Sequence, residues 1–184
     1  MRLLFPKPYA DFVARLRVPS GFLLVAAFAW FSHPDGRSLA YGLAVSLSGL
    51  ALRAWAAGHL AKNRTLASSG PYAYTRNPLY LGTLLVAAGL AIASRSAGLG
   101  ALFALVFLCI YLPVIQLEQQ HLRGLFPEYA AYAARVPALL PRMTPVSGGE
   151  PRTFRRALYL KNREYQAAAG FAAGALFLLW KAFR

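Results

Sequence analysis

Two stretches of the chain gather side chains that could bind a ligand or act on it. The first, residues 58–82, reads GHLAKNRTLASSGPYAYTRNPLYLG and is rich in tyrosine and arginine. Gly70 and Pro71 indicate a turn, and Asn77 before Pro78 is typical of the start of a helix, whose free N–H groups suit an anion. Tyrosine and arginine are also common anchors at a membrane surface, so the residues alone leave a ligand site and an anchor both open.

The second stretch, residues 117–142, reads LEQQHLRGLFPEYAAYAARVPALLPR. Its apolar and aromatic residues recur at the spacing of one helix face. Gly124 and Pro127 interrupt that pattern and predict two helices joined by a bend. Glu118 is one of only 6 acidic residues in the chain and lies close to His121 in the sequence. A carboxylate at this position is either functional or merely solvated, and the pattern favours neither interpretation.

The elements that hold these two stretches are predicted to lie in lipid. Of the 184 residues, 58% are hydrophobic and only 14% are charged, whereas soluble domains carry about 25% charged residues. The net charge of +14 suits nucleic acid or anionic lipid. Because the chain has no polar domain with which to bind nucleic acid, we interpret the charge as a signal of topology and of contact with lipid head groups. The three histidines are dispersed and Cys109 is the only cysteine, so no metal site is expected.

The fold class predicted for residues 1–184 is all-α, a polytopic membrane helical bundle that forms a single membrane domain. About five transmembrane helices are expected, because a span needs roughly 20 mostly apolar residues and the apolar runs are 18–31, 39 to about 60, 79–94, 97–117 and about 165–183. The first run is short and is expected to borrow a turn from the amphipathic residues before it. In the last run, Gly170 and Gly174 have the spacing of close helix packing. Residues 1–57 supply the N-terminal spans, 58–141 a core with both stretches, and 142–184 a linker at 143–152, a basic interfacial helix and the last span.

The basic residues predict which end of this bundle faces the cytoplasm. Most of the 20 lysines and arginines lie before the first span, between the second and third, or after the fourth. The positive-inside rule therefore predicts a cytoplasmic N-terminus, with residues 59–78 and 117–164 on the same face, where they can build one site. Within the second span, Arg53 is expected to reach toward the nearer interface. Glu164, before the last span, either approaches a ligand or favours a helix N-terminus.

Taken together, the two stretches resemble the isoprenylcysteine carboxyl methyltransferase family, part of a wider group of integral-membrane methyltransferases that includes phospholipid methyltransferases. The resemblance covers residues 58–141 and is carried by GPYAYTRNPLYLG and then by E-Q-x-x-L-x-x-x-F-x-x-Y-x-x-Y-x-x-x-V-P-x-x-x-P. Three positions depart from the family pattern. Asn77 stands in place of a histidine, Gln119 in place of a second glutamate, and Pro127 in place of a glycine.

The resemblance implies a bacterial inner-membrane enzyme that uses S-adenosylmethionine and methylates a hydrophobic or lipid-like acceptor reaching it from the bilayer. The cofactor would bind in a cytosolic pocket that is not a Rossmann site, which agrees with the absence of a GxGxxG motif. Arg76 would pair with the cofactor carboxylate, and Glu118 with its hydroxyls or amine, so these two are the candidate catalytic residues. The candidate cofactor-binding residues are His59, Tyr72, Arg76, Asn77, Pro78, Tyr80, Gly82, Glu118, Gln119, His121, Phe126, Tyr129 and Tyr132.

Three functional hypotheses follow from the sequence. The leading one is methyl transfer to a carboxylate, an amine or a thiol of the acceptor. The second is an NADPH-dependent membrane reductase of related fold, and the third is a small membrane transport or assembly protein without enzymatic activity. The chain is short for a reductase, and Arg53 alone does not indicate an ion pathway. Membrane lipids are expected partners, no nucleic-acid or metal partner is predicted, and the sequence leaves the oligomeric state open.

Overall fold

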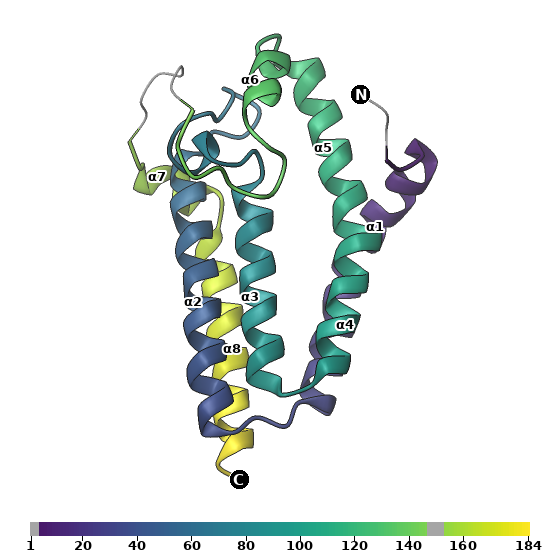
Figure 1. Ribbon diagram of the computed structural model, residues 1–184, viewed down its shortest axis with the longest axis vertical. Helices are drawn as coiled ribbons and strands as arrows, with labels where there is room; N and C mark the ends of the chain where they lie inside the picture. The colour runs from purple at the N-terminus through teal and green to yellow at the C-terminus, as the bar shows by residue number, and fades with distance from the viewer. Residues whose placement is uncertain (1–3, 147–152) are drawn as a thin grey trace.

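The computed structural model describes residues 4–146 and 153–184, and the regular structure in these residues is entirely helical (Figure 1). The elements are α1 (Lys7–Phe31), α2 (Gly36–His59), the 3-10 turn η1 (Gly70–Ala73), α3 (Pro78–Ser94), α4 (Ala97–Val106), the π-helical turn η2 (Phe107–Tyr111), α5 (Leu112–Leu125), α6 (Tyr129–Arg135), α7 (Arg156–Lys161) and α8 (Glu164–Ala182). The all-α prediction is confirmed. Most of the predicted linker at 143–152 lies outside the described residues.

Helices occupy all five predicted spans, but they differ in their fitness to cross a membrane. Among the described residues, three helices are long and apolar enough to do so: Lys7–Phe31, Gly36–His59 and Ala97–Leu125, the last being α4, η2 and α5 in one rod. α3 is a shorter apolar helix of 17 residues, which rises by about 26 Å where a hydrocarbon core is about 30 Å thick. α8 carries Glu164 and Lys181 near its two ends and is not among the three.

The first helix begins earlier than the predicted apolar run. α1 starts at Lys7 and continues through Pro19, so the span does extend into the amphipathic residues before it. The Tyr9 hydroxyl donates to the backbone carbonyl of Cys109 at 2.8 Å. The side chain of Gln116 bonds both the N–H and the carbonyl of Phe5, at 3.1 and 2.8 Å. These bonds fix the start of α1 against η2 and α5.

Small residues bring α2 and α3 into close contact. A Cβ added at Gly89 would collide with α2 at Ser46, whose hydroxyl donates to the backbone carbonyl of Val86 at 3.0 Å. The sequence-based expectation of close packing at Gly170 and Gly174 is wrong, because a Cβ at either position would meet nothing within 4 Å. The α2–α3 pair is thus the tightly packed frame from which the loop at 60–77 projects.

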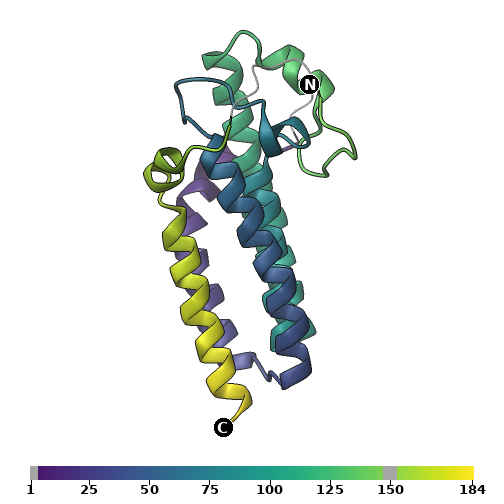
Figure 2. The same cartoon turned by 90° about the vertical axis from the view of Figure 1, so that its left-hand side faces the viewer.

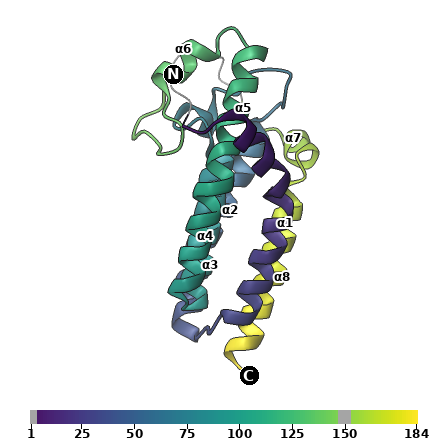
Figure 3. The same cartoon turned by 90° about the vertical axis from the view of Figure 1, so that its right-hand side faces the viewer.

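The long helices run side by side and give the molecule two ends (Figures 1 and 2). The start of α1, residues 60–77, α6 and α7 lie at one end, which we call the loop end, and the C-terminus lies at the other (Figure 3). α5 ends at Leu125, and α6 starts at Tyr129 after a bend, as the interruption at Gly124 and Pro127 predicts. Residues 59–78 and the described residues of 117–164 therefore meet at one end of the bundle.

Arg53 does not reach toward the interface, which corrects the sequence-based expectation. Its Nε and Nη2 donate to the two carboxylate oxygens of Glu164 at 3.0 and 2.9 Å, and its Nη1 donates to the Leu79 carbonyl and the Thr83 hydroxyl. The side chains of this ion pair are only 21% and 10% exposed. Glu164 is also the first residue of α8, so it combines a favourable place at a helix start with a link from α8 to α2 and α3.

Candidate active site

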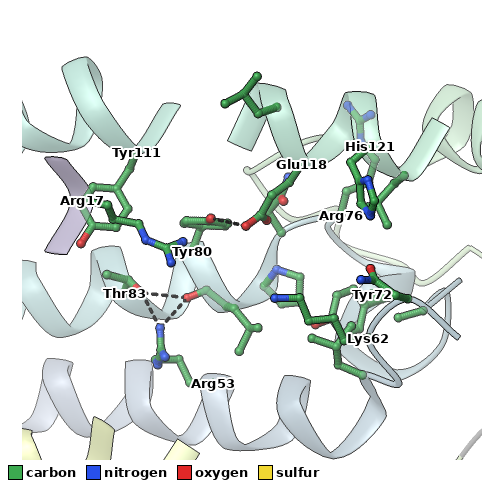
Figure 4. Close-up of a pocket in the computed structure, with 18 of the residues that line it drawn as sticks. Arg17, Arg53, Lys62, Tyr72, Arg76, Tyr80, Thr83, Tyr111, Glu118 and His121 are labelled. Atoms are coloured by element: carbon green, nitrogen blue, oxygen red, sulfur yellow. Dashed lines mark hydrogen bonds between the residues drawn. The ribbon is translucent and has the colours of Figure 1, made fainter. Parts of the chain in front are cut away.

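A cavity of about 1000 Å³ lies at the loop end, between α1, the first turns of α3, α5, α6 and the loop that follows α2 (Figure 4). Arg76, Tyr72, Lys62 and His121 gather at one end of the cavity, and Arg17, Tyr80 and Tyr111 at the other. Apolar residues of α1 extend the second end along the bilayer-spanning part of the bundle. The cavity therefore combines a polar end with an apolar one.

The loop before α3 is held in place by the segment that follows α6. The Arg76 N–H donates to the Pro137 carbonyl at 2.9 Å, and the Thr75 hydroxyl donates to the Leu139 carbonyl at 3.0 Å. α3 begins at Pro78 as predicted, but the side chain of Asn77 does not cap it. The Asn77 amide donates instead to the Ala138 carbonyl at 2.7 Å. The two stretches that the sequence singles out thus support each other directly.

The guanidinium of Arg76 lies at one end of the cavity, and only part of it is already hydrogen-bonded to neighbouring side chains. Its Nη1 donates to Gln119 Oε1 at 3.3 Å and to the Tyr129 hydroxyl at 3.4 Å. Its Nε is buried and makes no hydrogen bond to any described residue. Because Gln119 is neutral, it orients Arg76 without cancelling the charge, whereas a glutamate there would form an ion pair. Arg76 is therefore a positive group without an ion-pair partner among the described residues, and an anionic ligand in the cavity would supply one.

Glu118 and Tyr80 form the second polar pair of the cavity. The Tyr80 hydroxyl donates to Glu118 Oε1 at 2.8 Å (Figure 4). The Tyr80 ring contacts Tyr111 edge to face, with centroids 6.2 Å apart. Tyr111 is the last residue of the π-helical turn η2, and such turns change the direction in which side chains leave a helix. Glu118 thus presents a hydrogen-bonded carboxylate above an aromatic wall.

Buried aromatic side chains close the polar end of the cavity. Tyr129 and Tyr132 contact each other edge to face, with centroids 6.1 Å apart. The Tyr132 hydroxyl donates to the Tyr72 carbonyl at 2.7 Å. Burial raises the pKa of Tyr72 and of Tyr132 far above the ordinary tyrosine value, and it raises the pKa of Tyr129 against the opposing charge of Arg76. These rings stay neutral at physiological pH and offer electron-rich faces to a cation or a base.

Replacing Tyr132 with phenylalanine is expected to lower the free energy of unfolding by about 1 kcal/mol, the usual net value of one hydrogen bond. Because the raised pKa favours the protonated hydroxyl in the folded state, its contribution is present below about pH 10, the unfolded pKa of tyrosine, and is lost as the pH rises toward the folded pKa. Chemical unfolding in detergent at neutral and strongly alkaline pH measures this. The wild type should lose more stability at high pH than Tyr132→Phe, and identical pH dependences would contradict the assignment.

Most of the predicted site residues meet around this cavity. Those that line it are Tyr72, Arg76, Asn77, Pro78, Tyr80, Glu118, His121, Phe126, Tyr129 and Tyr132. Gln119 contacts it through Arg76. His59 and Gly82 do not line it. His59 is buried under Gly70 with its Nδ1 bonded to the Trp55 carbonyl at 2.9 Å, and Gly82 faces α2 at Gly49 and Arg53.

Several lining residues escaped prediction. One face of α1 contributes a stripe made of Arg17, Val18, Gly21, Phe22 and Val25. The loop after α2 contributes the polar residues Lys62, Asn63 and Thr65, and the π-helical turn contributes Tyr111. The α1 stripe repeats at the spacing of a helix face, so a helical projection from Lys7 onward would have grouped it. No sequence signal marks Tyr111, because its direction depends on the π-helical turn.

Among the residues that the structure describes, no group of three or more His, Cys, Asp or Glu side chains could hold a metal ion. Glu118 and His121 line the same cavity. The charged side chains that line the cavity are Arg17, Arg53, Lys62, Arg76 and Glu118, and its tyrosines add neutral hydroxyls and rings.

One protein family and two curated proteins are similar to this chain. The family model for phospholipid methyltransferases matches residues 39–129, from α2 to the first residue of α6. The cobalt-zinc-cadmium resistance protein CzcN of Cupriavidus metallidurans is 38% identical over 153 residues, which cover 79% of this chain and 71% of that protein. The nickel-cobalt-cadmium resistance protein NccN of Alcaligenes xylosoxydans xylosoxydans is 32% identical over 151 residues, 76% of this chain and 71% of that protein. No solved structure matches the chain. The chain belongs to the phospholipid methyltransferase family, a family of membrane methyltransferases.

Proposed function

We propose that the protein transfers a methyl group from S-adenosylmethionine to a carboxylate or amine of a lipid-like acceptor. The observation that carries this proposal is one cavity whose lining combines charged and aromatic side chains, Arg76 and Glu118 among them, with an apolar stripe of α1. A polar donor and a hydrophobic acceptor both find matching surroundings in one cavity. Its volume of about 1000 Å³ is at the upper limit of single-ligand pockets, about 300 to 1000 Å³, and suits two ligands side by side.

The residues present fit the cofactor. The guanidinium of Arg76, which lines the cavity and has no ion-pair partner among the described residues, is a donor for the cofactor carboxylate, which a planar guanidinium binds well. Glu118, held by Tyr80, is an acceptor for the cofactor amine or ribose hydroxyls. The neutral rings of Tyr129 and Tyr132 suit the adenine and the sulfonium. Each chemical group of the cofactor thus has a counterpart among the residues that line the cavity.

The task of these residues is to bind, orient and exclude water. When bound, S-adenosylmethionine would supply a methyl group carried on a positively charged sulfur: the acceptor's lone pair forms the new bond to the methyl carbon, the carbon–sulfur bond breaks, and the sulfur leaves as a neutral thioether. Arg76 and the tyrosines hold the donor, and the apolar end holds the acceptor in line with it, so the reaction gains from proximity and orientation. A carboxylate acceptor needs no base. An amine acceptor loses one proton, and Glu118 is the cavity carboxylate able to accept it.

Calorimetric titration of the detergent-purified protein tests the proposal. We expect S-adenosylmethionine to bind in the micromolar range and S-adenosylhomocysteine to compete with it. NADPH serves as the contrasting ligand for the reductase hypothesis. A folded sample that binds NADPH and not S-adenosylmethionine would replace the proposal with the reductase, and a sample that binds neither would support a non-enzymatic role.

We further propose that the loop end faces the cytoplasm in a bacterial inner membrane. The support is the basic residues at that end, which include Lys62, Arg64 and Arg135, together with the preference of cytoplasmic loops for positive charge. Fusions at the C-terminus test this directly. Alkaline phosphatase at the C-terminus should be active, because that end would then lie outside the cytoplasm, while a fluorescent C-terminal fusion that is bright in the cytoplasm would reverse the orientation.

The names of the two relatives favour a role in metal resistance. CzcN and NccN are named as resistance proteins for cobalt, zinc, cadmium and nickel, and we propose that the methylated product of this chain serves the same end. A metal-sensitive bacterial host carrying the wild-type chain should then grow at higher cadmium or cobalt concentrations than one carrying Arg76→Gln. Equal growth of the two strains would show that the chain's effect on metal resistance does not depend on methyl transfer, and would contradict this proposal.

A further inference from the structure

One stripe of α1 forms part of the cavity wall. Arg17, Val18, Gly21, Phe22 and Val25 all line it, and they share one face of the helix. The residues Val18, Phe22 and Val25 are 62%, 73% and 69% exposed. α1 lies outside residues 39–129, so the family match says nothing of this stripe. It forms an open apolar wall that begins at Arg17.

Gly21 makes this wall a groove. A Cβ added at Gly21 would meet nothing within 4 Å, so the missing side chain leaves open space beside the cavity. Phe22 and Val25 continue the apolar surface on the same face toward the bilayer centre. A hydrocarbon chain bound along this surface would shield its apolar side chains from the water in the cavity.

The charges around the cavity favour an acidic head group. Its described lining residues include four cations, Arg17, Arg53, Lys62 and Arg76, and one carboxylate, Glu118. Arg53 is neutralised by Glu164, and neither of the ion pairs among the described residues involves Arg17. The cofactor of the proposed function would add net positive charge, since its sulfonium and amine outnumber its carboxylate. An acid is the acceptor group that balances this excess.

Arg17 is the cation placed to receive that acid. It lies beside Tyr80 and Tyr111 at the end of the cavity opposite His121 and Arg76 (Figure 4). The Tyr80 hydroxyl connects this place to Glu118. An acid bound by Arg17 would therefore lie next to the residues that the proposed function assigns to the cofactor, with its tail directed along Gly21.

We propose that α1 forms the acceptor site, which takes an amphiphile with an acidic head, a carboxylate or a phosphate, against Arg17 and a hydrocarbon tail along Gly21, Phe22 and Val25. The term acceptor rests on the proposed function, whereas the site itself does not. The site excludes an amphiphile whose head is only a cation, because Arg17 would repel it.

Photoreactive amphiphiles test the site without the cofactor. The probes are hexadecanoate, hexadecyl phosphate and hexadecylamine, each with a diazirine in the tail, applied to the full chain in neutral phosphatidylcholine nanodiscs. Mass spectrometry of cross-linked α1 peptides gives the labelling, and competition with unlabelled probe gives the apparent affinity. We expect the two acids to label the segment around Gly21 at concentrations about tenfold below the amine, as one charge-assisted hydrogen bond implies. Of these two probes, the one that labels more strongly identifies the preferred head group, either a carboxylate as in a fatty acid or a phosphate as in a lipid.

Matched variants separate the site from general effects. Arg17→Gln is expected to weaken labelling by the acids about tenfold and to spare the amine, whereas Arg15→Gln, at an exposed arginine of α1 outside the cavity, leaves labelling unchanged. Gly21→Leu fills the groove and should reduce labelling by all three probes. Gly174→Leu, at a glycine of α8 with equal free space, should not.

Amine labelling as strong as that by the acids, or equal effects of Arg17→Gln and Arg15→Gln, would overturn the proposal. The same holds if Gly174→Leu reduces labelling as much as Gly21→Leu. Calorimetry with S-adenosylmethionine on the same samples keeps the two claims apart. Arg17-dependent labelling in a protein that binds no S-adenosylmethionine would retain the acidic-amphiphile site and reject the proposed function.

Discussion

Arg76→Gln is expected to weaken S-adenosylmethionine binding by at least about tenfold, because the cofactor carboxylate loses a charge-assisted hydrogen bond of about 1.5 to 3 kcal/mol. The effect should be large because Arg76 carries an uncompensated charge and a buried donor without a partner among the described residues. The two side-chain hydrogen bonds that Arg76 makes are long, 3.3 Å to Gln119 and 3.4 Å to the Tyr129 hydroxyl, so losing them should cost little and the fold should survive. Calorimetry with S-adenosylmethionine measures the change.

Two further variants sharpen this prediction. Arg76→Lys keeps the charge but removes the planar guanidinium, which can donate two parallel hydrogen bonds to a carboxylate. This variant should bind the cofactor more weakly than the wild type and more tightly than Arg76→Gln. Arg64→Gln removes an exposed arginine from the same loop, outside the cavity, and should bind like the wild type. If Arg76→Gln and Arg64→Gln bind the cofactor equally well, Arg76 does not hold the carboxylate.

Glu164→Ala is expected to lower the free energy of unfolding by about 3 to 5 kcal/mol, the usual cost of leaving one partner of a buried ion pair alone. Without Glu164, Arg53 keeps only the Leu79 carbonyl and the Thr83 hydroxyl as partners. Its charge then lies uncompensated between α2 and α3. Chemical unfolding in detergent, followed by circular dichroism, measures the loss.

The control for this prediction is the exposed ion pair at the other end of the bundle. Arg95 and Asp35 are 57% and 45% exposed, and Arg95→Ala should cost only about 0 to 1 kcal/mol. Truncating Arg95 also leaves the Asp35 side chain free to accept from the Ser38 N–H at the start of α2. If the two alanine variants lose the same stability, the Arg53–Glu164 pair does not behave as a buried pair.

The helices and the meeting of the two chemical stretches could be predicted because both follow from local patterns. Apolar runs located every long helix, and Gly124 and Pro127 located the bend between α5 and α6. The aromatic and charged residues of the two stretches meet because the hairpin of α3 and α4–α5 returns the chain to the end where it started. Sequence periodicity reports such features directly.

What the sequence did not predict depends on contacts between distant residues or on local irregularity. The Arg53–Glu164 pair joins residues far apart in the chain, and no local pattern reports it. Tyr111 enters the cavity through a π-helical turn that apolar periodicity does not reveal. The position of His59 in the sequence, close to the other candidates, predicts a place in the site, but its ring lies under Gly70 at the end of α2.

The central claim is that the chain moves a methyl group from S-adenosylmethionine to a lipid-like acceptor, and one measurement tests it most directly. Purified protein is incubated with S-adenosylmethionine that carries a radiolabelled methyl group and with lipids extracted from bacterial membranes, and the organic phase is counted. We predict label in the organic phase that depends on the protein and is strongly reduced by Arg76→Gln. Label that stays in the aqueous phase with a sample that binds the cofactor would contradict a lipid-like acceptor, and equal transfer by wild type and Arg76→Gln would contradict the site.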